Sequence, residues 1–389
     1  MASTTNAVLG ARALNRATLA RQLLLSRAEL SARDAVSHLV GLQAQNVKPP
    51  YFQLHARLAG FRPAELAGLM ESREVVRMVT MRSTIHTHTA EDALALRGLV
   101  QPARDREVNY FRKGLAGVDL VRLAGLAREL VEEAPRTMAE LREALAVHWP
   151  DADPQSLGVA ARCRLPLVQV TPRGVWGRSG QVRLTTLEHW LGQGGGGGPV
   201  GVGGQGTDAG AYVDEVVLRY LAAFGPASVQ DMQTWAGLTR LKAAFERLRP
   251  ALVTFRDEKG VELFDLPDAP RPDEDTPAPP RFLPEFDNLL LSHADRTRVV
   301  PADLKGRTWK GNQAYRVLLV DGFLGGLWKL TEGEAEGKGG GGAARLTVDL
   351  FEGVGERRKE EIVAEGELLA GGPMTEAERV VVEFGAVAV

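Results

Sequence analysis

The sequence predicts an α+β fold built from three tandem winged helix-turn-helix units with added β-strands. One local plan recurs three times, in which short helical patterns precede two extended segments joined by a turn, as in a winged helix. Stretches rich in glycine or proline separate parts of the chain. With 389 residues, of which 44% are hydrophobic and 25% charged, the chain has enough material for about two to four globular units.

The first unit is expected in residues 1–119. Its helical patterns lie near 15–26, 32–44, 50–59 and 63–72. Extended segments at 75–80 and 83–89 follow, with a turn at Met81 and Arg82. Ser31 and Asp34 have the spacing of a capping box, which predicts a helix N-terminus at Ser31.

The second and third units are expected in residues 120–191 and 211–280. The second has helical patterns near 120–133, 138–147 and 154–164, then extended segments at 167–170 and 175–178. The third has helical patterns near 211–223, 228–236 and 239–248, then extended segments at 252–255 and 261–264. A capping box at Thr137 and Glu140 marks one helix start in the second unit.

Glycine-rich segments indicate where the chain leaves the packed units. Residues 192–210 are expected to form a linker between the second and third units. A β-rich region is expected over 281–389, in which strands at 327–330 and 345–350 flank a glycine-rich hairpin loop at 333–342. The acidic tail after Glu352 is predicted to be a solvated helix.

The two halves of the chain differ in charge. Residues 1–190 carry 25 Lys and Arg against 18 Asp and Glu, a balance of +7, which leaves 22 against 31, or −9, for residues 191–389. A basic half suits a polyanionic partner. No apolar run is long enough for a membrane span, and the N-terminus lacks a secretory signal, so a cytoplasmic protein is expected, in bacteria at the nucleoid when bound.

Several cofactor classes lack their sequence signatures. There is no Gly-x-Gly-x-x-Gly after a strand and no Walker-type motif, so no nucleotide cofactor is expected. The single cysteine, Cys163, excludes an internal disulfide and is more simply a packed helix residue than a nucleophile. No metal is expected, because His86 and His88 have no local third and fourth ligand.

Gln43 and Gln45 place two neutral amides at the end of an apolar helical pattern. Side chains two residues apart share one side of an extended chain but not of an α-helix, so both amides can face one ligand only if the helix unwinds here. Pro49 and Pro50 favour unwinding, because residues before proline avoid the helical region. The alternative is a helix C-terminus whose glutamines bond free backbone carbonyls.

Winged helices usually place one helix in a DNA groove and let the hairpin touch the backbone, although some bind only proteins. Here four ordered segments resemble the winged-helix DNA glycosylases of the AlkZ and YcaQ type, over residues 14–350. The segments are HLVGLQAQ at 38–45, RSTIH at 82–86 with AED at 90–92, YLAAFGPA at 220–227, and LPEFDNLL at 283–290. Gln43-Ala44-Gln45 resembles the Gln-apolar-Gln motif of the AlkZ branch.

The resemblance implies a C-shaped DNA-binding surface with Gln43 and Gln45 as catalytic residues near its centre. It further implies excision of N7-alkylated purines from double-stranded DNA, unhooking of interstrand crosslinks, and self-resistance to azinomycin B. A monomer without cofactors is expected. An N7-alkylated guanine is already a good leaving group. An enzyme can therefore catalyse its hydrolysis by positioning a water and directing oxygen dipoles toward the positive charge that develops on the sugar. Our hypothesis is that Gln45 holds the water, while Gln43 orients Gln45 or binds the deoxyribose.

Further residues are expected to contact DNA. They are Asn46, Lys48, Arg82, His86, His88, Arg173, Arg296 and Arg298. Lys48 is expected to bind phosphate rather than form a Schiff base, which argues for an abasic product without strand cleavage. The two histidines alternate along one strand face, which is either the DNA surface or a solvated face. Arg296 and Arg298 are expected on one strand face.

Two alternatives remain open on the sequence alone. Asp287 could be catalytic, but the segment Asp287-Asn288 also suits a turn in which both side chains bond backbone groups. The whole chain could be a noncatalytic winged-helix DNA-binding protein, either a regulator or one that sequesters damaged DNA. Binding of a free drug rather than its DNA adduct is a third reading that no feature specifically supports.

Overall fold

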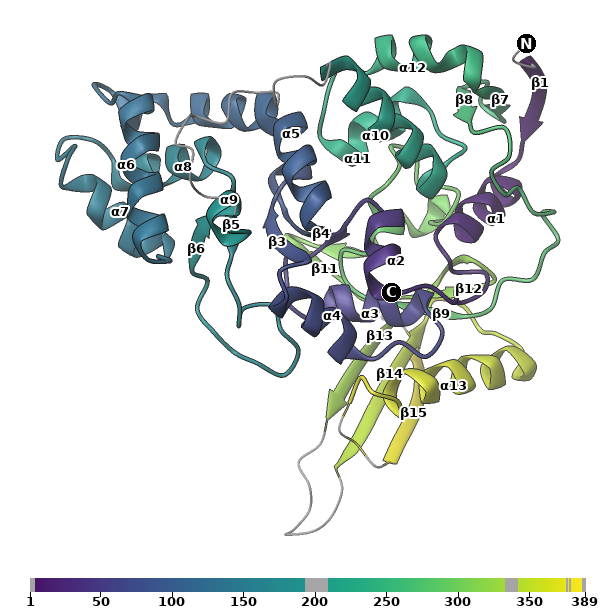
Figure 1. The fold of residues 1–389 in the computed structure, drawn as a ribbon. Coiled ribbons are helices and arrows are strands. Elements are labelled where there is room, and N and C mark those ends of the chain that lie inside the picture. Colours follow the sequence, from purple (N-terminus) through teal and green to yellow (C-terminus); the bar gives the residue numbers. More distant parts are fainter. Residues whose placement is uncertain (1–3, 193–208, 333–341, 376, 378, 387–389) are drawn as a thin grey trace.

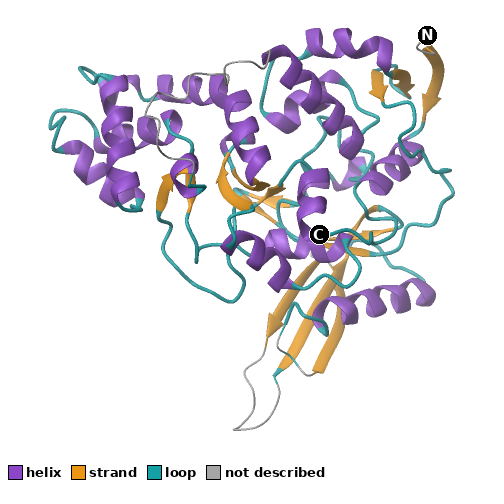
Figure 2. Cartoon of the chain, viewed as in Figure 1, coloured by secondary structure: helices purple, strands orange, loops and turns teal. Residues whose placement is uncertain are grey.

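The structure is a computed structural model that describes residues 4–192, 209–332, 342–375, 377 and 379–386. It is a mixed α+β fold, as predicted, in which helices surround several small sheets (Figure 2). In Figure 1 the helices α6 to α8 form the left side of the molecule and α10 to α12 the upper right, while the longest strands and α13 lie below.

The helices lie close to the predicted patterns in most of the chain. Their bounds are α1 Ala11–Arg21, α2 Ala32–His38, α3 Pro49–Arg57, α4 Pro63–Glu71, α5 Ala90–Tyr110, α6 Leu120–Glu133, α7 Met138–Ala146, α8 Pro154–Arg164, α9 Leu187–Trp190, α10 Ala209–Phe224, α11 Val229–Ala236, α12 Lys242–Leu248 and α13 Glu356–Ala370. Short 3₁₀ turns lie at η1 Met81–Ser83, η2 Arg112–Leu115, η3 Arg249–Ala251, η4 Asn288–Leu290 and η5 Ala302–Leu304.

The predicted caps at Ser31 and Thr137 are confirmed. Ser31 Oγ accepts the N–H of Asp34 at 3.0 Å, and the Thr137 side chain accepts that of Glu140 at 3.2 Å. The Glu140 carboxylate in turn accepts the N–H of Thr137 at 2.8 Å, which completes a capping box.

One five-stranded antiparallel sheet joins strands expected in two different units. Its order is β2-β4-β3-β5-β6, with β2 Leu42–Gln43, β3 Val75–Val79, β4 Ile85–Thr89, β5 Leu167–Gln169 and β6 Leu184–Thr186. The prediction of a strand at 175–178 is wrong, because cis-Pro172 and the positive φ angles of Gly174 and Gly177 make turns there. The partner of β5 is instead β6.

A second five-stranded sheet and helix α13 occupy the C-terminal part of the chain. The sheet order is β15-β14-β13-β12-β9, with β9 Arg281–Leu283, β12 Val317–Val320, β13 Phe323–Glu332, β14 Ala343–Leu350 and β15 Arg379–Ala386. The predicted strand pair is confirmed by the antiparallel β13 and β14, although most of the predicted loop, 333–341, lies outside the described residues. The helix predicted in the acidic tail is confirmed as α13, but it is not wholly solvated, because it buries Ile362, Leu369 and Ala370.

The remaining strands form two small sheets. In the first, β1 Thr4–Leu9 pairs parallel with β7 Val253–Asp257, which pairs antiparallel with β8 Glu262–Asp265. In the second, β10 Trp309–Lys310 and β11 Gln313–Ala314 form a hairpin. Of the linker predicted at 192–210, residues 193–208 lie outside the described part, and Ala209 already belongs to α10.

Three large apolar clusters hold these elements together. One lies between α2 to α4 and the C-terminal sheet, one within α10 to α12 and against α5, and one within α6 to α8. Helix α5, which periodicity did not reveal, contributes Leu96 and Val100 to the second and Val108 to the third. The first sheet, with β2 and β4, lies where these clusters meet (Figure 1).

Candidate active site around Gln43 and Gln45

The helix predicted over 32–44 ends at His38, and the chain then turns into a strand. Val40 and Gly41 have φ angles of 54° and 96°, and a Cβ atom at Gly41 would lie 2.2 Å from Nδ1 of His88. Only glycine fits this position. From Gly41 the chain enters β2, where Leu42 lies opposite Thr87 and Gln43 opposite His86. The expected unwinding between helix and glutamines is therefore confirmed.

The backbone of Gln43 is fixed from two sides. Its N–H donates to Oδ1 of Asn288 at 3.3 Å, while Nδ2 of Asn288 donates to the carbonyl of Gly41 at 2.7 Å. The carbonyl of Gln43 accepts from Nε2 of Gln53 at 3.0 Å. Asn288 thus bonds β2 as a neighbouring strand would, and Gln43 is left only 4% exposed.

The side chain of Arg82 sets the orientation of the Gln43 amide. Nη2 of Arg82 donates to Oε1 of Gln43 at 2.5 Å, and Nη1 donates to the carbonyl of Trp235 near the end of α11. Because a guanidinium only donates, the oxygen of Gln43 must face Arg82 and its amide nitrogen must face the other way. Burial and the nearby charge of Arg296 lower the pKa of Arg82 to about 10. At pH 7 Arg82 therefore remains charged.

Gln45, in contrast to Gln43, is exposed. Between them Ala44 is held by two hydrogen bonds, from its N–H to the carbonyl of Ile85 at 2.7 Å and from Nη2 of Arg77 to its carbonyl at 2.9 Å. Oε1 of Gln45 accepts the N–H of Ile85 at a long 3.5 Å, so this amide can turn to a ligand. A fixed amide and an accessible amide therefore lie two residues apart.

His86 and His88 lie inside the protein, so both interpretations of them from the sequence are wrong. Their side chains are 1% and 0% exposed, and the rings stack with centroids 5.5 Å apart. Nδ1 of His86 lies 3.0 Å from the carbonyl of Thr84, and Nε2 of His88 lies 2.9 Å from the hydroxyl of Thr80. Burial lowers both pKa values, that of His88 to about 4. The two rings are therefore neutral at pH 7 and support β4 from inside the protein.

Arg296 and Arg298 do not share a strand face, because their segment is a loop. Arg296 is exposed and lies near Arg82. Arg298 is buried, and its guanidinium donates to the carbonyl of Pro226 at 2.8 Å and to the hydroxyl of Thr18 at 3.2 Å. Arg298 therefore joins α1 to the start of the α11 segment and is not available to DNA in this conformation.

The remaining residues predicted to contact DNA are Asn46, Lys48 and Arg173. Nδ2 of Asn46 donates to Oε1 of Glu285 at 3.1 Å. Nζ of Lys48 lies 5.5 Å from the centre of the Trp176 ring. Arg173 is half-buried in the loop after β5, with Nη1 3.5 Å from the carbonyl of Gly180. Lys48 and Asn46 are exposed.

Asp287 has a structural role. Its two carboxylate oxygens each accept from Arg57 at 2.8 Å, and both side chains are fully buried. Its Oδ1 also accepts the N–H of Leu289 at 3.0 Å, as expected for the turn interpretation. Sequence reasoning missed Gln53 and Arg77 around Gln43, and it missed that Asn288 bonds the backbone of β2. None of these three features has a local sequence signal.

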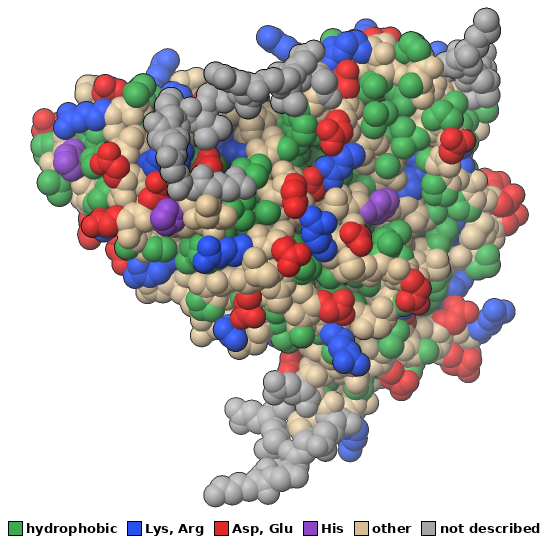
Figure 3. Space-filling model, in the orientation of Figure 1, with side chains coloured by type: hydrophobic (Ala, Val, Ile, Leu, Met, Phe, Trp, Pro, Cys, Tyr) green, Lys and Arg blue, Asp and Glu red, His purple; other side chains and the backbone are tan. Residues whose placement is uncertain are grey.

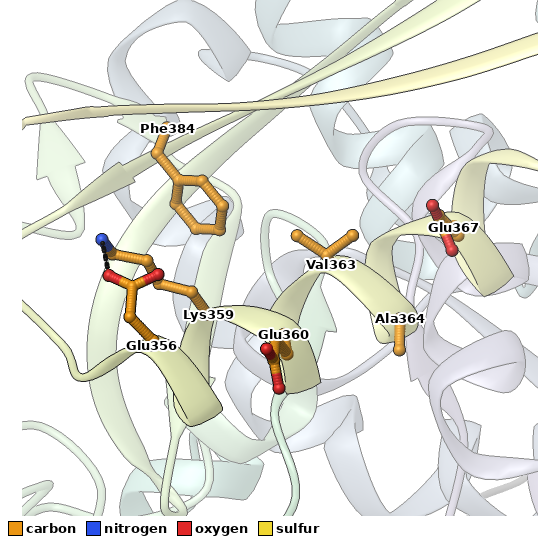
Figure 4. A pocket seen from close by; sticks show the side chains of 7 residues that line it. All are labelled: Glu356, Lys359, Glu360, Val363, Ala364, Glu367 and Phe384. Carbon is orange, nitrogen blue, oxygen red and sulfur yellow. Dashed lines mark hydrogen bonds and ion pairs between the residues drawn. The ribbon is translucent and has the colours of Figure 1, made fainter.

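A cavity of about 470 Å³ lies away from this site, between α13 and β15, and is lined by Val363, Ala364 and Phe384 with acidic side chains at its rim (Figure 4). No part of it contacts Gln43. In the described ranges, no group of three or more His, Cys, Asp and Glu side chains could hold a metal ion. Figure 3 shows one face, where acidic and basic side chains are interspersed.

The fold and this site define a class of DNA-repair enzyme. Residues 36–371 match the family model for AlkZ-like DNA glycosylases, so the chain belongs to that family, whose members hydrolyse N-glycosidic bonds. The resemblance found in the sequence is thereby confirmed.

A solved structure shares the fold. It is the Streptomyces sahachiroi DNA glycosylase AlkZ, which is similar with a TM-score of 0.76 and 18% identity over 97% of this chain and 100% of that chain. No curated protein sequence matches significantly. Within the described residues, no helix is both long and apolar enough to cross a membrane.

Proposed function

We propose that this chain excises bulky N7-alkylpurines from double-stranded DNA, with Gln43 and Gln45 as the catalytic residues. The observation that carries the proposal is the pairing of a fixed amide with an accessible one. Gln43 is held by Asn288, Gln53 and Arg82 at the end of β2, and the exposed Gln45 follows it in a bend. Amides held in this way are preorganised dipoles, which suit a reaction whose leaving group is already activated.

The orientation of Gln43 assigns different tasks to the two amides. Oε1 of Gln43 is occupied by Arg82, so this residue offers an N–H donor and binds an oxygen of the deoxyribose. Gln45 offers its carbonyl oxygen, which accepts a hydrogen bond from the water that attacks C1′ and so orients it. This division corresponds to one of the two roles considered for Gln43 from the sequence, and it uses no ionisable base.

The expected product is an abasic site in an uncleaved strand. A lyase needs an amine at the sugar, and Lys48 is the nearest lysine in sequence. Its Nζ lies over the Trp176 ring and 4.0 Å from Glu332. These contacts favour a role on the DNA backbone rather than attack at C1′.

Arginines without acidic partners surround the glutamines. These arginines are Arg77, Arg82, Arg173 and Arg296. None of the four forms an ion pair with a carboxylate of the described residues. Arg82 bonds Gln43 and has Arg296 nearby, while Arg77 bonds Ala44 and has Arg173 nearby. Cations left unpaired around a site attract a polyanion, so DNA phosphates on both sides of the damaged nucleotide are the natural counter-ions.

The arrangement proposed for the whole chain is three winged helices around a C-shaped DNA-binding surface, working as a monomer. The proposed substrates include interstrand crosslinks, and the proposed role is resistance to azinomycin B. The exposure of Gln45 supports a bulky lesion, because a large adduct or crosslink cannot be moved into a closed pocket.

The test is base release from a duplex with one azinomycin-type N7-guanine adduct. Alkali-labile sites are counted for the parent, Gln43→Ala, Gln45→Ala and the double variant, with DNA affinity measured in parallel. Gln230→Ala, which removes an exposed amide on α11, is the matched control. We expect release by the parent and the control only, at equal affinity for all. Tight binding by the parent without release would instead identify a protein that sequesters damaged DNA.

A further inference from the structure

Arg77 is a buried cation that forms no ion pair with any carboxylate of the described residues. Its side chain in β3 is 2% exposed, and its guanidinium donates to the carbonyl of Ala44 at 2.9 Å and to Oε1 of Gln169 at 3.4 Å. Nη1 is enclosed and has no hydrogen-bond partner within the described residues. Two fully buried arginines elsewhere, Arg21 and Arg57, each have a carboxylate partner. Burying a charge is costly unless an opposite charge offsets it.

A second guanidinium, that of Arg173, lies nearby. Burial lowers the pKa of Arg77 to about 10, and the neighbouring charge of Arg173 contributes to this shift. Among the described residues, Nε of Arg173 is enclosed without a hydrogen-bond partner, and Nη1 has a long contact of 3.5 Å to the carbonyl of Gly180.

The backbone of the loop holds the two arginines together. A Cβ atom at Gly174 would lie 2.4 Å from Cδ of Arg77, and the φ angle of Gly174 is 102°. The carbonyl of Gly174 accepts from the hydroxyl of Tyr51 at 2.7 Å. This loop is therefore anchored against Arg77 in spite of the charge repulsion. An arrangement that keeps two like charges close is stabilised when an anion binds between them.

We propose that Arg77 and Arg173 form a binding site for one phosphodiester group of the DNA strand, adjacent to the nucleotide held by Gln43 and Gln45. The proposal rests on the proposed function for its position on the substrate. Arg173, which is partly exposed, contacts the phosphate, and Arg77 lies beneath it and adds the second charge. Since Arg77 also bonds the carbonyl of Ala44, a phosphate here fixes the segment between the two glutamines relative to the DNA backbone.

The first test is the salt dependence of binding to an undamaged duplex. A lost phosphate contact lowers the slope of log K against log salt by about 1. We expect that reduction for Arg173→Ala and no reduction for Arg178→Ala, which removes an arginine of the same loop that is paired with Glu71 at 3.1 Å. Arg77→Met, which removes the second charge but not the contact, should weaken binding of the duplex, and Arg77→Lys, which keeps the charge, should not. An unchanged slope for Arg173→Ala overturns the proposal, whether or not Arg77→Met folds.

The second test locates the phosphate. A duplex with a central tetrahydrofuran abasic analogue fixes the register, and a neutral methylphosphonate replaces one linkage at a time. The parent should lose affinity at one linkage next to the analogue, and Arg173→Ala should lose nothing further there. If the two losses add at every linkage, no phosphate is bound by this pair. Both tests measure binding, so absence of base release by the parent would refute the proposed function and leave this inference standing.

Discussion

Nη2 of Arg82 donates a hydrogen bond of 2.5 Å to Oε1 of Gln43, across 39 positions of sequence. The same guanidinium donates to the carbonyl of Trp235 near the C-terminal end of α11, where helix carbonyls concentrate negative charge. Gln43 therefore takes its orientation from Arg82, which is itself held by helix α11. The segment Gln43-Ala44-Gln45 and helix α11 are therefore connected through one side chain.

This orientation predicts that a glutamate cannot replace Gln43. Gln43→Glu keeps an oxygen facing Arg82 but removes the N–H donor, so we expect single-turnover excision to fall about 10²-fold, as for Gln43→Ala. DNA affinity, measured on an undamaged duplex, should stay near that of the parent. Full activity in Gln43→Glu would mean that Gln43 works through its oxygen instead.

Asn288 should be needed both for stability and for the position of β2. Asn288→Ala leaves the N–H of Gln43 and the carbonyl of Gly41 without their partner, at about 1–3 kcal/mol for each buried group. We expect a lower free energy of unfolding in urea together with slower excision. Asn288→Asp retains an acceptor for Gln43 but no donor for Gly41, and an intermediate loss should follow. Equal stability of Asn288→Ala and the parent would contradict this role.

The buried pair of Arg57 and Asp287 should behave as structure, not as catalytic machinery. Removing one partner leaves an uncompensated buried charge, so Asp287→Ala should lose about 3–5 kcal/mol of unfolding free energy. The exposed Arg357→Ala, which breaks a surface pair with Glu361, is the control and should lose less than about 1 kcal/mol. An Asp287 variant that is stable but inactive would restore the catalytic interpretation.

Buried histidines should make the protein sensitive to mild acid. Burial lowers the pKa values of His55 and His88 to about 4 and lowers those of His86 and His293 as well. Unfolded histidines bind protons below about pH 6.5, while folded His55 and His88 stay neutral until near pH 4, so stability should fall as pH decreases through that window. Each contributes up to about 1.4 kcal/mol per pH unit.

Urea unfolding at pH 7 and pH 5 checks this expectation. His55→Gln should reduce the difference in unfolding free energy between the two pH values, because one buried proton acceptor is gone. His148→Gln, at an exposed position, is the matched control. Equal stability of the parent at pH 5 and pH 7 would show that the histidines are accessible to protons in the folded state.

The sequence predicted helices and strands well where the signal lies within the element itself. Capping boxes gave helix starts at Ser31 and Thr137, and apolar periodicity located α6 to α8 and the strands β13 and β14. The two prolines and the spacing of Gln43 and Gln45 predicted that the helix ends before the glutamines, which places Gln43 in β2 and Gln45 in the bend after it. Helix α5 was not predicted, because its apolar residues pack into two separate clusters and so do not form one continuous stripe.

By itself the sequence determined the α+β class, the family and the motif that the site is built on. Only the tertiary structure decided that His86, His88 and Arg298 are buried, that Arg82 orients Gln43, and that Asn288 pairs with β2. Periodicity assigns a residue to one face of its own element, but burial depends on which distant segment covers that face. Asn288 reaches Gln43 across 245 positions of sequence, and no pattern within one helix or strand encodes such a contact.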